Sequence, residues 1–317
     1  MDEETKPTNH VMPGARPKIP TRFRPGVLGM SILAGWDKES VTENRPSSHS
    51  LRAWTCGVFA GCALAAAAAL AEDAAPPSQP NLVTQANAPL SSVLQLRLQE
   101  GYQPEFKHVD GDGNVFLIGI TMPLPKYRLL PFPQLSLLTI PAAVTPPLGS
   151  TGFGDVRFID VAVFQPHGRV LWGLGPTLVF PTASEDETGQ GKWQAGPAFA
   201  AAYTPGSWLA ALLAHNPISF AGDDDRLQTN TLFLQPTVSV QLGKGWFVRS
   251  VPLMAFNWKT DKQLVPIDLG AGRVFKIGRQ NVSCFIEPFY SVIADEPAPK
   301  YGVTFGVTLL YPNFWGS

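Results

Sequence analysis

Residues 246–258 read WFVRSVPLMAFNW, and this stretch alternates between two kinds of position. The even positions carry Trp246, Val248, Ser250, Pro252, Met254, Phe256 and Trp258. A period of two is typical of a β-strand, because successive side chains point to opposite faces. At about 3.3 Å per residue and a tilt of about 40°, the distance between the two tryptophans is about 30 Å, close to the separation of two membrane interfaces. The stretch therefore predicts a strand that crosses a lipid bilayer.

Three further segments alternate in the same way, at residues 170–180, 232–242 and 301–311. Each is longer than the five or six residues usual for strands of soluble sheets. No segment of comparable length has an apolar period near 3.6, the sign of an amphipathic helix. The sequence therefore predicts an all-β protein.

The connections between these segments alternate in length. Short turns are predicted at 165–169, 204–207, 243–245 and 278–280, and longer polar loops at 183–192, 221–230, 259–263 and 294–300. Outer-membrane barrels have short periplasmic turns and longer external loops. With weaker strands near 92–102, 114–122 and 134–140, the pattern predicts a transmembrane antiparallel β-barrel of about 12 strands, with both chain ends on the periplasmic side.

Proline occurs in the middle of several predicted strands, where its missing N–H interrupts the ladder. These residues are Pro176, Pro197, Pro236, Pro252, Pro266 and Pro288. A soluble sandwich of shorter strands is the alternative, but the alternation continues through each proline. We therefore expect bulges or bends at these positions.

The composition excludes other classes of protein. Only 15% of the 317 residues are charged, against about 25% in soluble domains. A net charge of -1 gives no support for binding nucleic acid. Three cysteines exclude a disulfide scaffold, and a mean hydropathy of +0.03 excludes a bundle of membrane-spanning helices.

Residues 51–71 have the pattern of a secretory signal, with Arg52 before an apolar core and cleavage expected after Ala71. A membrane anchor and lipidation at Cys62 are the alternatives. We expect residues 1–50 to be a disordered extension, residues 72–91 a periplasmic linker, and residues 92–312 the barrel. An overextended reading frame would also explain the first 50 residues.

Several phrases resemble a family of Gram-negative outer-membrane barrels. They are GFGD at 152–155, WGLGP at 172–176, FPTA at 180–183, GKW at 191–193, FAGDDDR at 220–226, FLQP at 233–236, VPIDLG at 265–270 and FGVTLL at 305–310. The family is called transporter-like, carries the misleading label neuromedin U-like, and is similar to barrels linked to aromatic-degradation pathways. The resemblance covers roughly residues 92–312. It implies an outer-membrane barrel with a transport function, and it supplies no catalytic residues.

With lipid outside the barrel, the opposite face of each strand points into a lumen. The candidate lumen-lining residues are Arg97, Gln194, Gln235, Arg249, Asn257, Asp268 and Glu287. Arginine beside carboxylates either selects solutes by charge or forms a salt-bridged plug that holds the wall. Twelve strands leave limited room inside, and the sequence favours neither interpretation.

Acidic residues gather in loops predicted to be external, above all Asp223, Asp224 and Asp225. We expect this loop to be solvated or to bridge lipopolysaccharide through divalent cations. The run 110–114 reads DGDGN, but glycine and glutamate are missing from the positions that an EF-hand requires. No metal site is predicted.

We expect a channel or uptake pore for small solutes, including hydrophobic or aromatic ones, in the cell outer membrane. A lipid hydrolase is one alternative, with His215 and Ser219 as its candidates, although no Gly-x-Ser-x-Gly motif is present. A non-conducting structural barrel is another. The prediction is that the protein is not an enzyme and has no cofactor. The expected partners are outer-membrane lipid and lipopolysaccharide, the barrel-assembly machinery and a small solute.

Overall fold

The computed structural model describes residues 82–126, 131–164, 170–295 and 297–312. The predictions for residues 1–50 and 51–71 therefore lie outside the described part of the chain. One short helix precedes the sheet, α2 (Leu82–Asn87). The strands are β1 (Leu94–Lys107), β2 (Gly113–Leu124), β3 (Gln134–Thr145), β4 (Val156–Phe164), β5 (Val170–Phe180), β6 (Lys192–Tyr203), β7 (Trp208–His215), β8 (Ile218–Gly222), β9 (Thr231–Gly243), β10 (Trp246–Ser250), β11 (Met254–Asn257), β12 (Lys262–Asp268), β13 (Gly270–Ile277), β14 (Gln280–Ala294) and β15 (Ala298–Tyr311).

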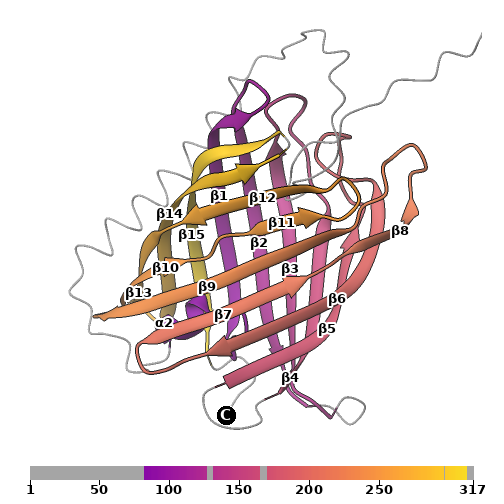
Figure 1. The fold of residues 1–317 in the computed structure, drawn as a ribbon. Coiled ribbons are helices and arrows are strands. Elements are labelled where there is room, and N and C mark those ends of the chain that lie inside the picture. The colour runs from indigo at the N-terminus through magenta and orange to yellow at the C-terminus, as the bar shows by residue number, and fades with distance from the viewer. Residues whose placement is uncertain (1–81, 127–130, 165–169, 296, 313–317) are drawn as a thin grey trace, which may run out of the picture.

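These segments form a closed antiparallel barrel of twelve strands (Figure 1). β15 pairs with both β14 and β1, which closes the ring. Three of the twelve strands are each divided into two segments. β7 and β8 both pair with β6, β10 and β11 with β9, and β12 and β13 with β14. The predicted fold is confirmed.

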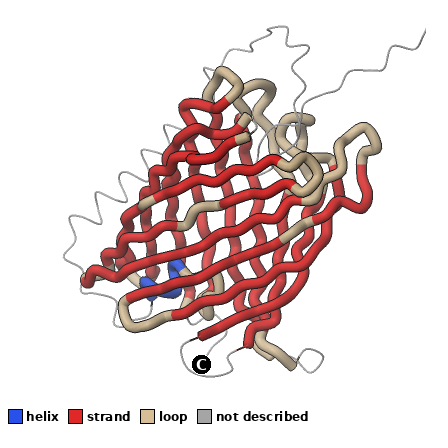
Figure 2. Tube along the Cα trace, viewed as in Figure 1, coloured by secondary structure: helices blue, strands red, loops and turns tan. Residues whose placement is uncertain are grey.

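The two ends of the barrel differ in their connections. At the turn end, tight turns at 204–207, 244–245 and 278–279 join the strands, and Leu94 at the start of β1 lies opposite Tyr311 at the end of β15. Lys244 adopts a positive φ of 50° in one of these turns. At the opposite, loop end, longer segments such as 181–191 and 223–230 connect the strands (Figure 2). Both ends of the sheet therefore lie at the turn end.

Side chains alternate between the two faces of the wall. Large apolar residues are exposed on the outside along the middle of the strands, such as Leu174 at 51% and Ile267 at 57%. Exposed aromatic residues lie at both ends: Tyr203, Trp208 and Trp246 at the turn end, and Trp193, Trp258 and Tyr301 at the loop end. An apolar band between two aromatic girdles is the surface of a barrel that faces lipid. Within the described residues, no helix is long and apolar enough to span a membrane.

The prolines affect the wall in different ways. Pro176 and Pro197 lie directly opposite each other in β5 and β6, and neither strand ends there. Pro252 lies in the gap between β10 and β11, and Pro266 lies at a register shift against β14. Pro217, which was not among the predicted positions, lies in the gap between β7 and β8. The expected interruptions are thus present at Pro252 and Pro266, as a gap and a bulge. They are absent where Pro176 pairs with Pro197.

The helix α2 packs against the inside of the barrel near the turn end (Figure 1). Leu82, Val83 and Ala86 form one buried cluster with Phe247 of β10 and Phe285 of β14. These residues belong to the segment 72–91, for which the sequence predicted a linker. The helix occupies part of the space that the closed sheet encloses.

Candidate functional site

The candidate site is the interior of the barrel, and it contains most of the residues predicted to line a lumen. Gln194, Arg249, Asn257 and Glu287 are buried, whereas Arg97, Gln235 and Asp268 are half-buried. Because the outer surface of the barrel is apolar, its buried polar side chains lie on the inside. Arg249 and Glu287 contact each other, Arg97 contacts α2, and Asp268, Asn257 and Gln194 form hydrogen bonds close to their own strands.

The first group surrounds Arg249. Its Nη2 donates to Glu287 Oε2 over 2.6 Å, and its Nη1 donates to Asn87 Oδ1 over 3.3 Å. The guanidinium carbon lies 3.5 Å from the centre of the Phe285 ring. Arg249 and Glu287 are each only 5% exposed. A buried ion pair of this kind holds β10, β14 and α2 in one arrangement.

Further side chains of the wall hold α2 by its backbone. Gln95 Nε2 donates to the Gln85 carbonyl over 2.7 Å, and Arg97 Nη2 donates to the Ala86 carbonyl over 3.3 Å. The last carbonyls of a helix lack partners within it, and they attract cations. Gln241 of β9 adds a side-chain bond to Thr84. The helix is therefore tied to the wall by polar contacts on one side and by apolar packing on the other.

Helix α2 was not predicted from the sequence, although a signal for it was present. Leu82, Val83 and Ala86 are spaced as one apolar stripe of a short helix. Six residues are too few for a helix to be stable alone, so only the wall around them accounts for its formation.

The other predicted residues act locally in the structure. Asp268 Oδ1 accepts bonds from Ser250 Oγ and the Val251 N–H, each 2.8 Å long, and bridges the gap between β10 and β11. Asn257 Oδ1 accepts the Lys259 N–H over 2.9 Å in the loop that follows β11. Gln194 Nε2 donates to the side chain of Gln190. None of these hydrogen bonds involves Arg249.

A second arginine lies inside the loop-end half of the barrel. Arg157 of β4 places its guanidinium carbon 4.8 Å from the centre of the Phe233 ring. His215 of β7 stacks on the same ring, with centres 5.0 Å apart and planes at 21°. Phe233 belongs to β9, so three separate strands meet here. Arg157 was not among the seven candidates, because its strand alternates less clearly in the sequence.

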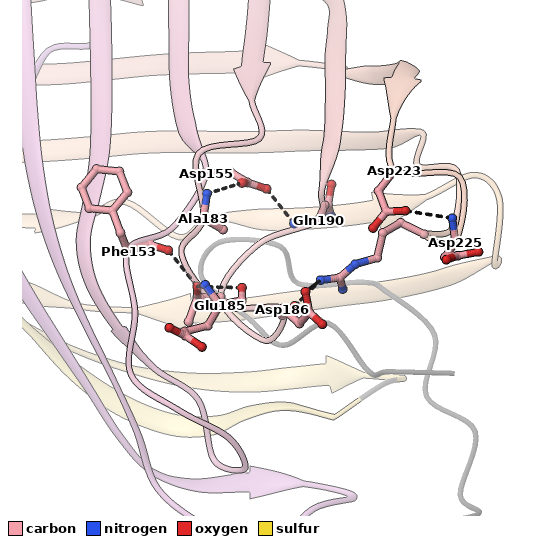
Figure 3. Close-up of polar contacts among 10 residues, drawn as sticks. Phe153, Asp155, Ala183, Glu185, Asp186, Gln190, Asp223 and Asp225 are labelled. Carbon is pink, nitrogen blue, oxygen red and sulfur yellow. Dashed lines mark hydrogen bonds and ion pairs between the residues drawn. The ribbon is translucent and has the colours of Figure 1, made fainter. Parts of the chain in front are cut away.

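The loop end is ordered by contacts between its loops (Figure 3). The Asp155 carboxylate accepts the Gln190 N–H over 2.6 Å and the Ala183 N–H over 3.2 Å, which fixes the loop 181–191. Burial raises the pKa of the Asp155 carboxyl above its usual value of 3.8, and these bonds oppose the rise. Arg226 pairs with Asp186 at 3.0 Å and so joins this loop to the next.

The predicted acidic loop forms part of the same region. Asp223 Oδ1 accepts the Asp225 N–H over 3.1 Å, as Figure 3 shows, and the Asp223 carbonyl accepts a bond from Lys192. Asp224 is exposed. Among the residues that the structure describes, no group of three or more His, Cys, Asp or Glu side chains could hold a metal ion.

The candidates for a hydrolase do not come together. The Ser219 hydroxyl donates to Gln228 Oε1 over 2.6 Å, and His215 stacks on Phe233. His215 Nδ1 has no hydrogen-bond partner among the described residues. A serine nucleophile needs a base within hydrogen-bond reach, and this pair does not supply one.

The barrel is similar to solved structures of outer-membrane proteins. An outer-membrane channel from Pseudomonas putida F1 is 11% identical, over 71% of this chain and 97% of that chain, with a TM-score of 0.52. The NanC porin is 8% identical, over 68% and 98% of the two chains, with a TM-score of 0.45. Outer membrane phospholipase A from Escherichia coli is 11% identical, over 71% and 100%, with a TM-score of 0.38. No family model matches the sequence, and no curated protein is similar to it.

Similarity at these levels of identity shows the fold alone. The chain is a β-barrel of the outer-membrane type, in agreement with the apolar band and the two aromatic girdles of its outer surface. The described protein is therefore an outer-membrane β-barrel. Its function has to be inferred from the residues of its interior.

Proposed function

We propose that the chain is a channel for small solutes in the outer membrane, with α2 as a constriction at its periplasmic end. One observation carries this proposal: α2 occupies the interior of a closed barrel and contacts it through side chains of β1, β9, β10 and β14. A barrel that served only as a wall would gain nothing from polar side chains that reach inward to a separate segment.

The attachment of α2 suits a part that moves. A six-residue helix has little stability of its own. Five of its six residues are buried, but side-chain hydrogen bonds and one apolar cluster hold it in place, and no strand pairing does. Segments with few contacts open locally at lower free energy than the rest of a fold. Displacement of α2 would widen the path without changing the pairing of the strands.

The inner wall of the barrel suits solutes that have a large apolar part. One buried apolar cluster includes Leu135, Ile159, Val161, Ala200 and Leu213, on the inner face of β3 to β7. Polar residues such as Gln95, Thr237, Ser239 and Thr308 are buried on β1, β9 and β15. Apolar and polar walls on two sides of one path favour small amphiphilic or aromatic solutes. The link to the transporter-like family and to aromatic-degradation pathways is part of this proposal.

The partners follow from the same interpretation. The apolar outer band would contact membrane lipid, and the loop of Asp223, Asp224 and Asp225 would meet lipopolysaccharide through divalent cations. Insertion into the membrane would use the barrel-assembly machinery. The proposed function involves no catalytic residue and no cofactor.

The test is single-channel conductance in planar lipid bilayers, with protein purified from outer membranes and checked by heat-modifiable gel migration. We expect discrete, reproducible current steps. Arg97→Gln removes a positive charge beside α2 and is expected to shift the reversal potential toward cation selectivity. Arg273→Gln, near Trp246 at the turn end, is the matched control. A folded protein without current steps, in the presence and absence of α2, would contradict the proposal.

A further inference from the structure

Arg157 is a cation inside the barrel whose charge interacts with Asp155 through space but forms no direct ion pair with it. Its Nε atom is buried and has no hydrogen-bond partner, and no ion pair among the described residues includes it. Its guanidinium group lies over the face of the Phe233 ring. A guanidinium group removed from water is costly unless it is paired and hydrogen-bonded. Arg157 as a whole is half-buried, so its Nε lacks a partner while part of the side chain stays accessible.

Two further polar atoms near Arg157 are also unpaired. His215 is 4% exposed, and its Nδ1 has no partner. Thr177 of β5 is fully buried, and its hydroxyl has no partner either. Thr177 lies opposite Ile159, two residues along the inner face from Arg157. Unpaired buried polar atoms are rare in native proteins. Nine such atoms are present among the described residues, and three of them lie on β4, β5 and β7 in this part of the interior, where they are available to a bound molecule.

The surroundings of these atoms are apolar. Ile159 and Val161 follow Arg157 along the inner face of β4, and Ala198 and Leu213 belong to the same buried cluster. Phe233 is part of a second buried cluster with Ala255 and Leu264. A ligand at this position would thus meet one cation and otherwise mostly hydrocarbon.

This chemistry selects a carboxylate. A guanidinium group binds a planar carboxylate through two parallel hydrogen bonds. Asp155 lies two residues away, immediately before β4, and its negative charge disfavours a dianion such as phosphate. The apolar walls suit an alkyl or aryl body.

We propose that Arg157, with His215 and Thr177, binds the carboxylate group of a small monocarboxylate whose apolar body lies along the inner wall. The inference names the solute class of the channel and so rests on the proposed function. Arg157 binds the carboxylate, Phe233 holds the guanidinium in place, and His215 and Thr177 complete the polar contacts.

The test is ligand-detected NMR titration of the protein purified from outer membranes, in a neutral detergent, with the signal of empty micelles subtracted. The probes are hexanoate and its neutral analogue hexanamide. We expect the wild type to bind hexanoate at least about tenfold more tightly than hexanamide, because a charge-assisted pair forms only with the carboxylate. Arg157→Gln is expected to remove this preference, whereas Arg273→Gln retains it.

The outcomes separate the site from the channel. Equal binding of both probes by the wild type, or an unchanged preference in Arg157→Gln, would mean that water alone meets these atoms, and it would overturn the proposal. If Arg157→Gln fails to fold, the wild-type comparison of the two probes decides by itself. Binding requires no ion flow: a protein that prefers hexanoate without conducting would contradict the channel alone, and a conducting protein without the preference would contradict the carboxylate site alone.

Discussion

The two halves of the barrel interior each contain an arginine, and the two arginines differ in their partners. In the turn-end half, Arg249 contacts Glu287, Asn87 and the face of Phe285. In the loop-end half, Arg157 lies over the face of Phe233 and forms no direct ion pair with a carboxylate of the described residues. Both guanidinium groups lie on an aromatic ring, so the ring does not distinguish them. The anion does.

This difference indicates what each half is for. A paired arginine holds neighbouring segments together, and here the segments are the wall and α2. An unpaired arginine keeps its hydrogen-bonding capacity for a ligand. The interior therefore combines an arginine that forms an ion pair and one that does not, although the Nε atom of each lacks a partner. The following variants separate the two, from the largest expected effect to the smallest.

The largest effect is expected for Glu287→Gln, which leaves Arg249 buried without its anion. Breaking a buried pair from one side costs about 3 kcal/mol of unfolding free energy. The measurement is the urea midpoint in lipid vesicles. The double variant Arg249→Gln with Glu287→Gln removes both charges and should recover most of the loss. If the single variant were as stable as the wild type, Arg249 would not depend on its partner.

Deletion of residues 82–87 is expected to raise single-channel conductance several-fold, because α2 occupies the turn-end half of the path. Conductance in planar bilayers measures this effect. Arg157→Gln leaves α2 in place and serves as the comparison, with a smaller change expected. An unchanged conductance after the deletion would show that the narrowest point lies elsewhere.

Arg157→Gln is expected to change the unfolding free energy by less than about 1 kcal/mol, and toward greater stability, since it removes an unpaired charge. The same substitution at Arg249 should destabilise the barrel clearly. Urea titrations of the two variants side by side provide the test. Equal losses at both positions would remove the distinction between the two sites.

The smallest effect concerns pH at the loop end. The pKa of Asp155 is raised in the folded protein by burial, so the folded state binds the proton more tightly than the unfolded chain. The contribution of this group to stability is thus present below its unfolded pKa and is lost as pH rises through its folded pKa. Asp155→Asn should reduce the fall in the urea midpoint between acidic and neutral pH. An identical pH dependence in both proteins would contradict this assignment.

Much of the fold could be predicted because it depends on local patterns. Residues 170–180 were predicted as a strand with the bounds that β5 has, since their alternation is unbroken. The order of short turns and long loops gave the count of twelve strands. The positions where strand pairing is interrupted were harder to predict. Pro252 and Pro266 lie at a gap and a register shift, whereas Pro176 and Pro197 do not. The effect of a missing N–H depends on the neighbouring strand as well as on the proline.

The sequence by itself thus determined the closed barrel, its lipid-facing surface and most of its inward polar residues, because a period of two sorts side chains to two faces wherever the chain is extended. Only the tertiary structure decided which arginine has a partner. Arg249 lies 38 residues from Glu287 and 162 residues from Asn87 in the sequence. These residues come into contact only in the closed barrel. The same closure leaves Arg157 facing Phe233 and places a six-residue helix inside the barrel.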